Sequence, residues 1–313
     1  MRIFQDTKRH AMIQRLEPIW TKLGHTLSKD PADCDVQLCF IHIRTKTNLP
    51  IVLRLDGVYY DKAINFKAKN RAISKAHRHA KGIIYQSTIS KEICERYLAK
   101  RTTENYVTVF NGIEENWGGD AESHEGINIV TTAKWRRWKR LQETINLFLT
   151  FLKFCPNSKL HILGRLYGNK KTIHPKIFYY GQVGFDKMKS IYKTADMFIH
   201  IARNDWCPKT VTEAIGSGIP VITTDGTGGS AEMCRITSGC IVVPGDKNSV
   251  QPDYPYQDPF NSISAVVKKR LRKAMVQIAK DKRRVLLPKE MNIEYVAQKY
   301  LEVLQNACKN KGK

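Results

Sequence analysis

Asp205, Pro208 and Glu213 are spaced so that they could form a ligand site in the stretch 203–233, RNDWCPKTVTEAIGSGIPVITTDGTGGSAEM. Pro208 is a residue type favoured at the first helical position, so a helix is predicted to begin there. The backbone N–H groups that follow would point out of the helix start and form an anion site. These N–H groups belong to Lys209, Thr210 and Val211. Asp205 would precede the site in a loop, and Glu213 would lie in the first turns of the helix.

The elements around this helix predict where the site lies in the fold. The helix is expected to end at the glycines of 216–218, and the next segment, IPVITTD at 219–225, is typical of a buried strand. A glycine-rich loop follows at 226–230. In an open parallel sheet, ligands bind outside the carboxyl ends of the strands. Both loops are therefore expected at that edge of a sheet.

Two series of alternating strands and helices predict two α/β domains. The first series has strand-like segments at 34–43, 49–60 and 81–87, with helical segments at 65–80 and 89–100. A glycine-rich acidic stretch, 113–126, is the predicted linker. The second series contains strands at 127–133, 159–164, 176–183, 196–201 and 219–225, with helices at 141–154, 186–195, 210–218 and 262–284. We expect domains at 1–112 and 127–291, and a C-terminal helix within 292–313 that completes the first domain.

The stretch 203–233 resembles the donor-binding signature of the retaining glycosyltransferases of family four, which have the GT-B fold. That signature is an acid, seven residues, a glutamate, then A-x-(A/S)-x-G-x-P-V-I and a Gly-Gly-x-x-Glu loop. Here it reads Asp205, Glu213, AIGSGIPVI, and Gly228-Gly229 followed by Glu232. The first acid is usually glutamate in that family, and many members have glycine where Pro208 stands. The resemblance implies two Rossmann-like domains facing each other across a cleft.

The resemblance also implies roles for individual residues. The segment ITTAKWRRWKRLQETINLF resembles a strand, turn and helix whose basic residues grip the donor diphosphate. The basic residues in question are Lys134 and Lys139, with Arg136 and Arg137 in the same turn. Glu213 would hold the ribose hydroxyls and Asp205 the sugar hydroxyls, with retention of anomeric configuration and no protein nucleophile. Contacts to the base are expected near 164–167 and 182–183, at Gly164, Arg165 and Val183.

Asp56 stands at the end of LRLDGVYY, where many members of the family carry a histidine that contacts the donor sugar. Its carboxylate would orient the acceptor or act as a base. The alternative is ordinary turn chemistry with Gly57.

The predicted reaction moves a sugar from a UDP-, GDP- or similar nucleotide sugar to a glycan, lipid-linked or other acceptor. A helix N-terminus and lysines can stabilise the leaving diphosphate, and no DxD pair lies in a donor loop, so neither a metal nor a cofactor is expected. The eight cysteines contain no CxxC pair and are expected to be reduced thiols in a cytoplasmic protein. The N-terminus has no apolar segment typical of a secretory signal.

The net charge of +23 leaves other functions open. Such a charge attracts polyanions, so a basic nucleic-acid-binding protein is one alternative, although no recognition signature supports specific nucleic-acid binding. A nucleotide-sugar epimerase and a non-catalytic binding module are two others. The basic runs at 268–273 and 281–284 are either a solvated helix face or a site of peripheral contact with an anionic membrane.

Overall fold

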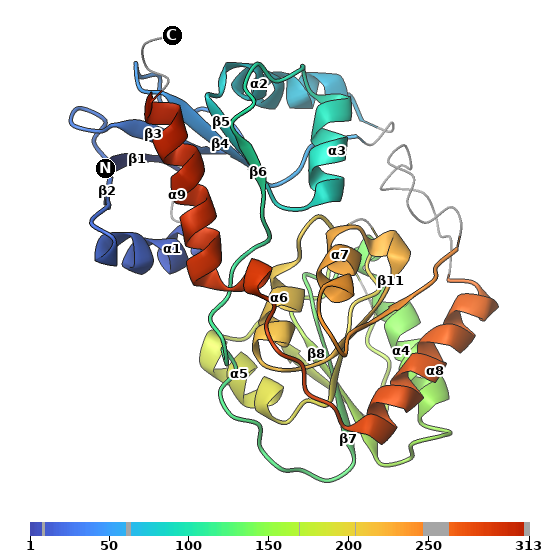
Figure 1. The fold of residues 1–313 in the computed structure, drawn as a ribbon. Coiled ribbons are helices and arrows are strands. Elements are labelled where there is room, and N and C mark those ends of the chain that lie inside the picture. The colour runs from blue at the N-terminus through green and yellow to red at the C-terminus, as the bar shows by residue number, and fades with distance from the viewer. Residues whose placement is uncertain (8–9, 61–63, 169, 204, 247–262, 310–313) are drawn as a thin grey trace. The chain divides into compact units, whose positions relative to one another are not determined.

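The computed structural model describes residues 1–7, 10–60, 64–168, 170–203, 205–246 and 263–309, and they form two compact α/β units (Figure 1). The first unit contains Met1–Gly112 and the C-terminal segment from Lys289. Its sheet has the order β2-β1-β3-β4-β5-β6, and every neighbouring pair is parallel. The strands are β1 (Arg2–Asp6), β2 (Thr26–Ser28), β3 (Val36–Phe40), β4 (Ile51–Leu55), β5 (Gly82–Tyr85) and β6 (Tyr106–Thr108).

Four helices surround the first sheet. They are α1 (Ala11–Lys22), α2 (Phe66–His79), α3 (Thr88–Tyr97) and α9 (Ile293–Lys309), with a short 3-10 turn at Lys289–Met291 before α9. The apolar faces of α1 and α9 meet and share one core with β1, β3 and β4, as the red and dark blue helices show (Figure 1). The last helix of the chain is therefore an integral part of the first unit.

A buried arginine ties α9 to the middle of this sheet. Arg54 of β4 is 1% exposed, and its Nε donates a 2.6 Å hydrogen bond to the Tyr300 hydroxyl. Its Nη2 donates to Asn111 Oδ1 at 2.7 Å. A buried charge is strongly unfavourable unless hydrogen bonds and a counter-charge compensate it. Arg54 thus links β4, α9 and the segment before residue 112.

Removing the hydroxyl partner of Arg54 should destabilise the first unit. We expect Tyr300→Phe to lower the free energy of unfolding by about 2 kcal/mol, because a buried charged donor loses its acceptor. Urea unfolding measures this change. The matched control is Tyr295→Phe on the same helix, where the ring is half-buried and the expected change is below about 0.5 kcal/mol. Equal effects of the two substitutions would contradict the role given to the Arg54–Tyr300 bond.

The second unit contains a second six-stranded parallel sheet with the order β12-β11-β10-β7-β8-β9. Its strands are β7 (Ile127–Thr132), β8 (Ser158–Leu163), β9 (Ile177–Gly181), β10 (Met197–Ile199), β11 (Val221–Thr224) and β12 (Ile241–Val243). Its helices are α4 (Leu141–Phe151), α5 (Phe185–Lys193), α6 (Lys209–Gly216), α7 (Gly229–Arg235) and α8 (Ala265–Asp281), with 3-10 turns at Arg137–Lys139 and Asp225–Thr227. Apolar residues of α4 and α8 form one core with the sheet.

The strand order of the second unit reverses beside β7. The chain runs from β7 to β8 and β9 on one side, then returns to place β10, β11 and β12 on the other. In doubly wound parallel sheets, ligands bind at this reversal, outside the carboxyl ends of the two strands that flank it. Here those strands are β7 and β10. The segments that follow them, 133–140 and 200–208, are the two that carry the predicted lysines and Asp205.

The predicted α/β class with two parallel sheets is confirmed. Two local predictions differ from the structure: the segment after Gly228 is helical from Gly229, and α6 begins at Lys209 with Pro208 as its N-cap. The predicted helix start at Ser262 and the chain end at 310–313 lie outside the described residues. All eight cysteines are free thiols. Among the described residues, no helix is long and apolar enough to cross a membrane.

Candidate functional site

The basic turn after β7 is anchored by a buried tryptophan. Trp135 is 2% exposed, and its indole N–H donates a 2.8 Å hydrogen bond to the carbonyl of Leu163. Its backbone bridges to Leu166, so the turn is fixed to the end of β8. Around this anchor the side chains of Lys134, Arg136 and Arg137 are exposed and that of Lys139 is half-buried. Trp135 is a packing residue that holds four cations at the strand end.

Lys139 and the loop after β10 meet at one carboxylate. The Lys139 ammonium forms an ion pair with Asp205 Oδ2, and His200 Nε2 lies 3.1 Å from the same oxygen. The side chain of Asp205 is only 15% exposed. Burial alone would raise the pKa of Asp205, but the Lys139 charge and the His200 hydrogen bond outweigh it and hold this pKa well below its usual range. Burial lowers the pKa of His200, so its ring is neutral and donates from Nε2.

The backbone of Asp205 also holds the glycine-rich loop. Asp205 and Gly228 form a parallel bridge, and Gly229 N donates a 2.9 Å hydrogen bond to the Asp205 carbonyl. Gly228 has φ +75° and ψ −128°, a conformation in which a Cβ would be strained. The loop before α6 and the loop after β11 are therefore joined at the strand ends, as their order in the chain predicted.

The start of α6 is less open than the sequence suggests. The N-cap Pro208 offers no side-chain hydrogen bond, and Val211 N donates to the Pro208 carbonyl at 3.1 Å. The Val211 amide is thus used within the first turn. Lys209 and Thr210 precede it at the helix start, where backbone N–H groups point out of the helix along its axis.

Glu213 lies inside the unit rather than on its surface. It is 5% exposed. Burial, together with the charge of Glu213, raises the pKa of the Tyr192 hydroxyl. That hydroxyl is 3.1 Å from Thr132 Oγ1 at the end of β7. Because the Glu213 carboxylate is buried within the unit, it cannot be explained as a surface group that favours the helix dipole.

The segment after β8 carries the residues expected to contact a base. Gly164 has φ +101° and its N donates to the Gly181 carbonyl at 2.6 Å, which brings the ends of β8 and β9 together. The Arg165 guanidinium lies 5.2 Å from the ring centre of Tyr167, and that of Arg136 lies 5.7 Å from it. Val183 is half-buried directly before the N-cap of α5.

Gly164 admits no side chain. A Cβ there would lie 1.9 Å from the Ala133 carbonyl oxygen. We expect Gly164→Ala to lower the free energy of unfolding of the second unit by about 3 kcal/mol, since both the clash and the positive φ must be accommodated. Gly168→Ala is a control for φ alone, with open space around it, and should cost about 1 kcal/mol. Gly184→Ala, with neither feature, should be within about 0.5 kcal/mol of wild type by urea unfolding.

Asp56 belongs to the first unit, and its carboxylate has more polar partners than turn chemistry with Gly57 would require. Its carboxylate pairs with Arg54 through Oδ1, accepts a 2.9 Å hydrogen bond from Gln86 Nε2, and has His10 Nε2 at 3.6 Å from Oδ2. The His10 ring packs on Phe40 with 4.3 Å between centroids. The structure thus adds His10 and Gln86 to Asp56 as polar groups at the strand ends of this unit.

The structure groups several of the predicted residues at the strand ends of the second unit. Lys139 contacts Asp205 and shares its turn with Lys134, Arg136 and Arg137. Gly164 and Arg165 adjoin that turn through Trp135. His200 was not among the predicted site residues, although it stands directly after β10, where ligand-binding side chains lie in a parallel sheet. Tyr192 gave no signal at all.

Residues 120–251 match the family model of the glycosyl transferases group 1. The chain carries a group 1 glycosyltransferase domain. This glycosyltransferase domain includes both loops of the site and all the predicted donor residues. No functionally curated protein has significant sequence similarity to the chain.

Solved structures share the fold of the whole chain. A sucrose-phosphate synthase from Thermosynechococcus elongatus is 11% identical, with a TM-score of 0.66 over 97% of this chain and 98% of that one. A glycosyltransferase from Rickettsia africae is 14% identical, with a TM-score of 0.63 over 99% of both chains. The Anabaena protein HepE, solved with UDP-glucose, is 13% identical, with a TM-score of 0.61 over 97% and 99%. At these identities the likeness shows the GT-B fold.

Proposed function

We propose that this glycosyltransferase binds a nucleotide-diphosphate sugar in its second unit and transfers the sugar, with retention of configuration, to a glycan, lipid-linked or other acceptor. The observation that carries the proposal is the ion pair of Lys139 with Asp205, in the loop that leads into α6, beside the reversal of strand order. A cationic turn, a helix start and a buried glutamate at such a point are suited to a nucleotide diphosphate.

The leaving diphosphate is the group that needs stabilisation. When the bond between the anomeric carbon and the phosphate oxygen breaks, the electron pair goes to the diphosphate. We assign the amides of Lys209 and Thr210 and the ammonium of Lys139 to that developing charge, with Lys134, Arg136 and Arg137 around it. Donor binding would draw Lys139 toward the phosphates and loosen its ion pair with Asp205. The lowered pKa keeps Asp205 ionised and able to accept hydrogen bonds from sugar hydroxyls.

Glu213 is assigned to the ribose hydroxyls. A buried carboxylate discriminates strongly between a ligand that supplies hydroxyl donors and one that does not. The Tyr167 ring with its two arginines, and Val183, are assigned to the base. UDP-glucose is the first donor to test, because HepE, of the same fold, was solved with it.

Retention without a protein nucleophile rests on the resemblance of 203–233 to family four. A reaction without a metal ion is proposed because the helix start and the lysines can stabilise the diphosphate. The cytoplasmic location rests on the eight cysteines without a CxxC pair, and peripheral contact with an anionic membrane rests on the basic runs 268–273 and 281–284. On the acceptor side, Asp56 with His10 is proposed to orient the attacking hydroxyl.

A panel of nucleotide sugars tests the donor assignment. Thermal unfolding in the presence of UDP-, GDP- and ADP-sugars is expected to show a raised midpoint with one base, since a ligand at about 100 times its Kd adds about 2.7 kcal/mol to the stability of the folded state. We expect UDP-sugars to give that shift. An absence of any shift across the panel would contradict the proposal, and conversion of the sugar without an acceptor would instead indicate an epimerase.

A further inference from the structure

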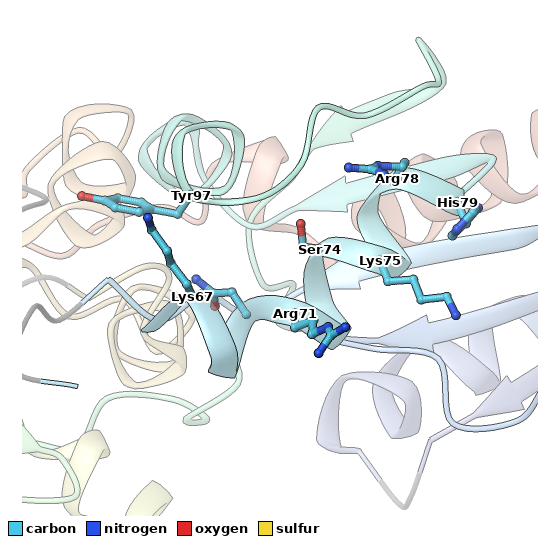
Figure 2. A pocket seen from close by; sticks show the side chains of 8 residues that line it. Lys67, Arg71, Ser74, Lys75, Arg78, His79 and Tyr97 are labelled. Atoms are coloured by element: carbon cyan, nitrogen blue, oxygen red, sulfur yellow. The ribbon is translucent and has the colours of Figure 1, made fainter. Parts of the chain in front are cut away.

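A cavity lined by basic side chains lies along α2 of the first unit, far along the chain from the proposed donor residues. The cavity has a volume of about 390 Å³ and is lined by polar as well as basic side chains. Its lining residues are Lys67, Asn70, Arg71, Ser74, Lys75, Arg78, His79 and Tyr97, which we call the α2 basic pocket. Figure 2 shows the basic side chains spread along the helix, with Tyr97 of α3 at the Lys67 end.

The charged residues of this region are all basic. From residue 62 to residue 91 the sequence has eight lysines and arginines and no aspartate or glutamate. The carboxylate of Glu95 in the neighbouring helix α3 already forms ion pairs with Lys91 and Arg101. No ion pair of Lys67, Arg71, Lys75 or Arg78 occurs among the residues that the structure describes. Within the described parts of the chain, the cations of the pocket therefore have no ion-pair partner.

The neutral residues of the pocket have structural roles. Asn70 accepts a 2.9 Å hydrogen bond from Tyr59 N and donates to the Tyr59 carbonyl at 2.6 Å. Ser74 Oγ accepts from Ala99 N at 2.7 Å. They hold the chain on either side of α2 and leave recognition to the cations.

The spacing of the cations is unfavourable for the helix by itself. Lys67, Arg71 and Lys75 follow one another at intervals of four, so they stand on one side of the helix and repel. Each like-charged pair at this spacing destabilises an isolated helix by about 0.2–0.5 kcal/mol. Bound anions would reverse this effect.

The length of the row sets the size of the ligand. At about 1.5 Å per residue, positions 67 and 78 are about 16 Å apart along the axis, which is more than one phosphate can span. We infer that the α2 basic pocket binds a ligand with several closely spaced phosphate groups, either as a soluble oligophosphate or as a phosphorylated headgroup. Lysine and arginine together supply the point charges and paired N–H donors that phosphates require. This site is separate from the donor site and does not depend on the proposed transfer reaction.

Titration with inorganic tripolyphosphate at physiological salt tests the inference, with calorimetry as the readout. The variant Lys67→Gln/Arg71→Gln/Lys75→Gln removes three exposed cations of α2. The matched variant Lys268→Gln/Lys269→Gln/Lys273→Gln removes three cations from α8. Tripolyphosphate that binds near α6 contributes equally in both proteins. We expect the α2 variant to bind at least about tenfold more weakly than wild type, and the α8 variant to stay within about threefold.

A second measurement separates the sources of phosphate and guards against misfolding. Vesicles of phosphatidylcholine with and without phosphatidic acid report headgroup binding. Because the basic run 268–273 is itself expected to contact an anionic membrane, the site is supported by loss of tripolyphosphate binding in the α2 variant alone, or by a larger loss of vesicle binding in the α2 variant than in the α8 variant. Without ligand, the α2 variant should unfold at the same or a higher urea concentration than wild type, because repulsion is relieved. Equal losses in the two variants, no binding to either probe, or preference for duplex DNA over both would overturn the inference.

Discussion

Replacing Glu213 by glutamine is expected to lower kcat/KM for the donor about 100-fold while the protein remains folded. The carboxylate is buried, and its charge acts on the Tyr192 hydroxyl, so water cannot take its place when a ribose hydroxyl needs an acceptor. Glutamine keeps the shape and loses the charge and one strong acceptor. Initial rates with the preferred nucleotide sugar measure the effect, and the donor-induced rise in unfolding midpoint should fall with it.

Glu143→Gln is the matched control for this substitution. Glu143 lies in the first turn of α4 in the same unit, near the helix start and the Arg140 guanidinium. It should leave the rate within about twofold and cost at most about 1 kcal/mol of stability. If Glu213→Gln retained full activity and full stabilisation by donor, Glu213 would be a structural residue and the ribose assignment would be lost.

Replacing Asp205 by asparagine should impair both activity and stability. Lys139 loses its counter-charge while His200 keeps an acceptor, so we expect a loss of about 2 kcal/mol, less than for a fully buried pair because the carboxylate is 15% exposed. Loss of a charged acceptor for sugar hydroxyls should lower kcat about 100-fold. Urea unfolding and initial rates give the two numbers.

The Asp205→Asn substitution should also change how the free energy of unfolding depends on pH in the acid range. The folded pKa of Asp205 is lowered, so its contribution is complete above about pH 4 and is lost as the pH falls toward the folded pKa. As the pH falls below about 4, the free energy of unfolding of Asp205→Asn should therefore decrease less than that of wild type. Asp186→Asn, an exposed acid at the start of α5, should leave that slope unchanged. An identical acid slope in wild type and Asp205→Asn would show that the ion pair contributes nothing.

The alternation of strands and helices was predictable because it depends on local apolar patterning. The strands β3, β4, β5, β7, β9, β10 and β11 fall within predicted segments, and β8 begins one residue before its predicted segment. The helix α7 was missed because Gly228 and Gly229 break most helices, and only the bond from Gly229 to the Asp205 carbonyl shows how this one begins. The edge strand β12 has three residues, too few to show a period.

Motif spacing predicted which residues belong to the site but not which of their side chains are in contact. The positions of Asp205, Glu213 and the basic turn follow from their order along the chain. The pairing of Lys139 with Asp205 joins residues 66 apart, and that of Arg54 with Tyr300 joins residues 246 apart. Such contacts depend on strand order, which local sequence does not encode. For the same reason, Asp56 could not be recognised as part of a network with His10 and Gln86.

We propose that the start of α6 and Lys139 together hold the donor diphosphate, and calorimetric titration can separate this contact from binding of the nucleoside. The titrants are the nucleoside diphosphate and monophosphate of the preferred base, on wild type and on Lys139→Ala. We expect wild type to bind the diphosphate at least about tenfold more tightly than the monophosphate, and most of this difference to disappear in the variant. Equal affinities in wild type, or a difference that survives in Lys139→Ala, would contradict it.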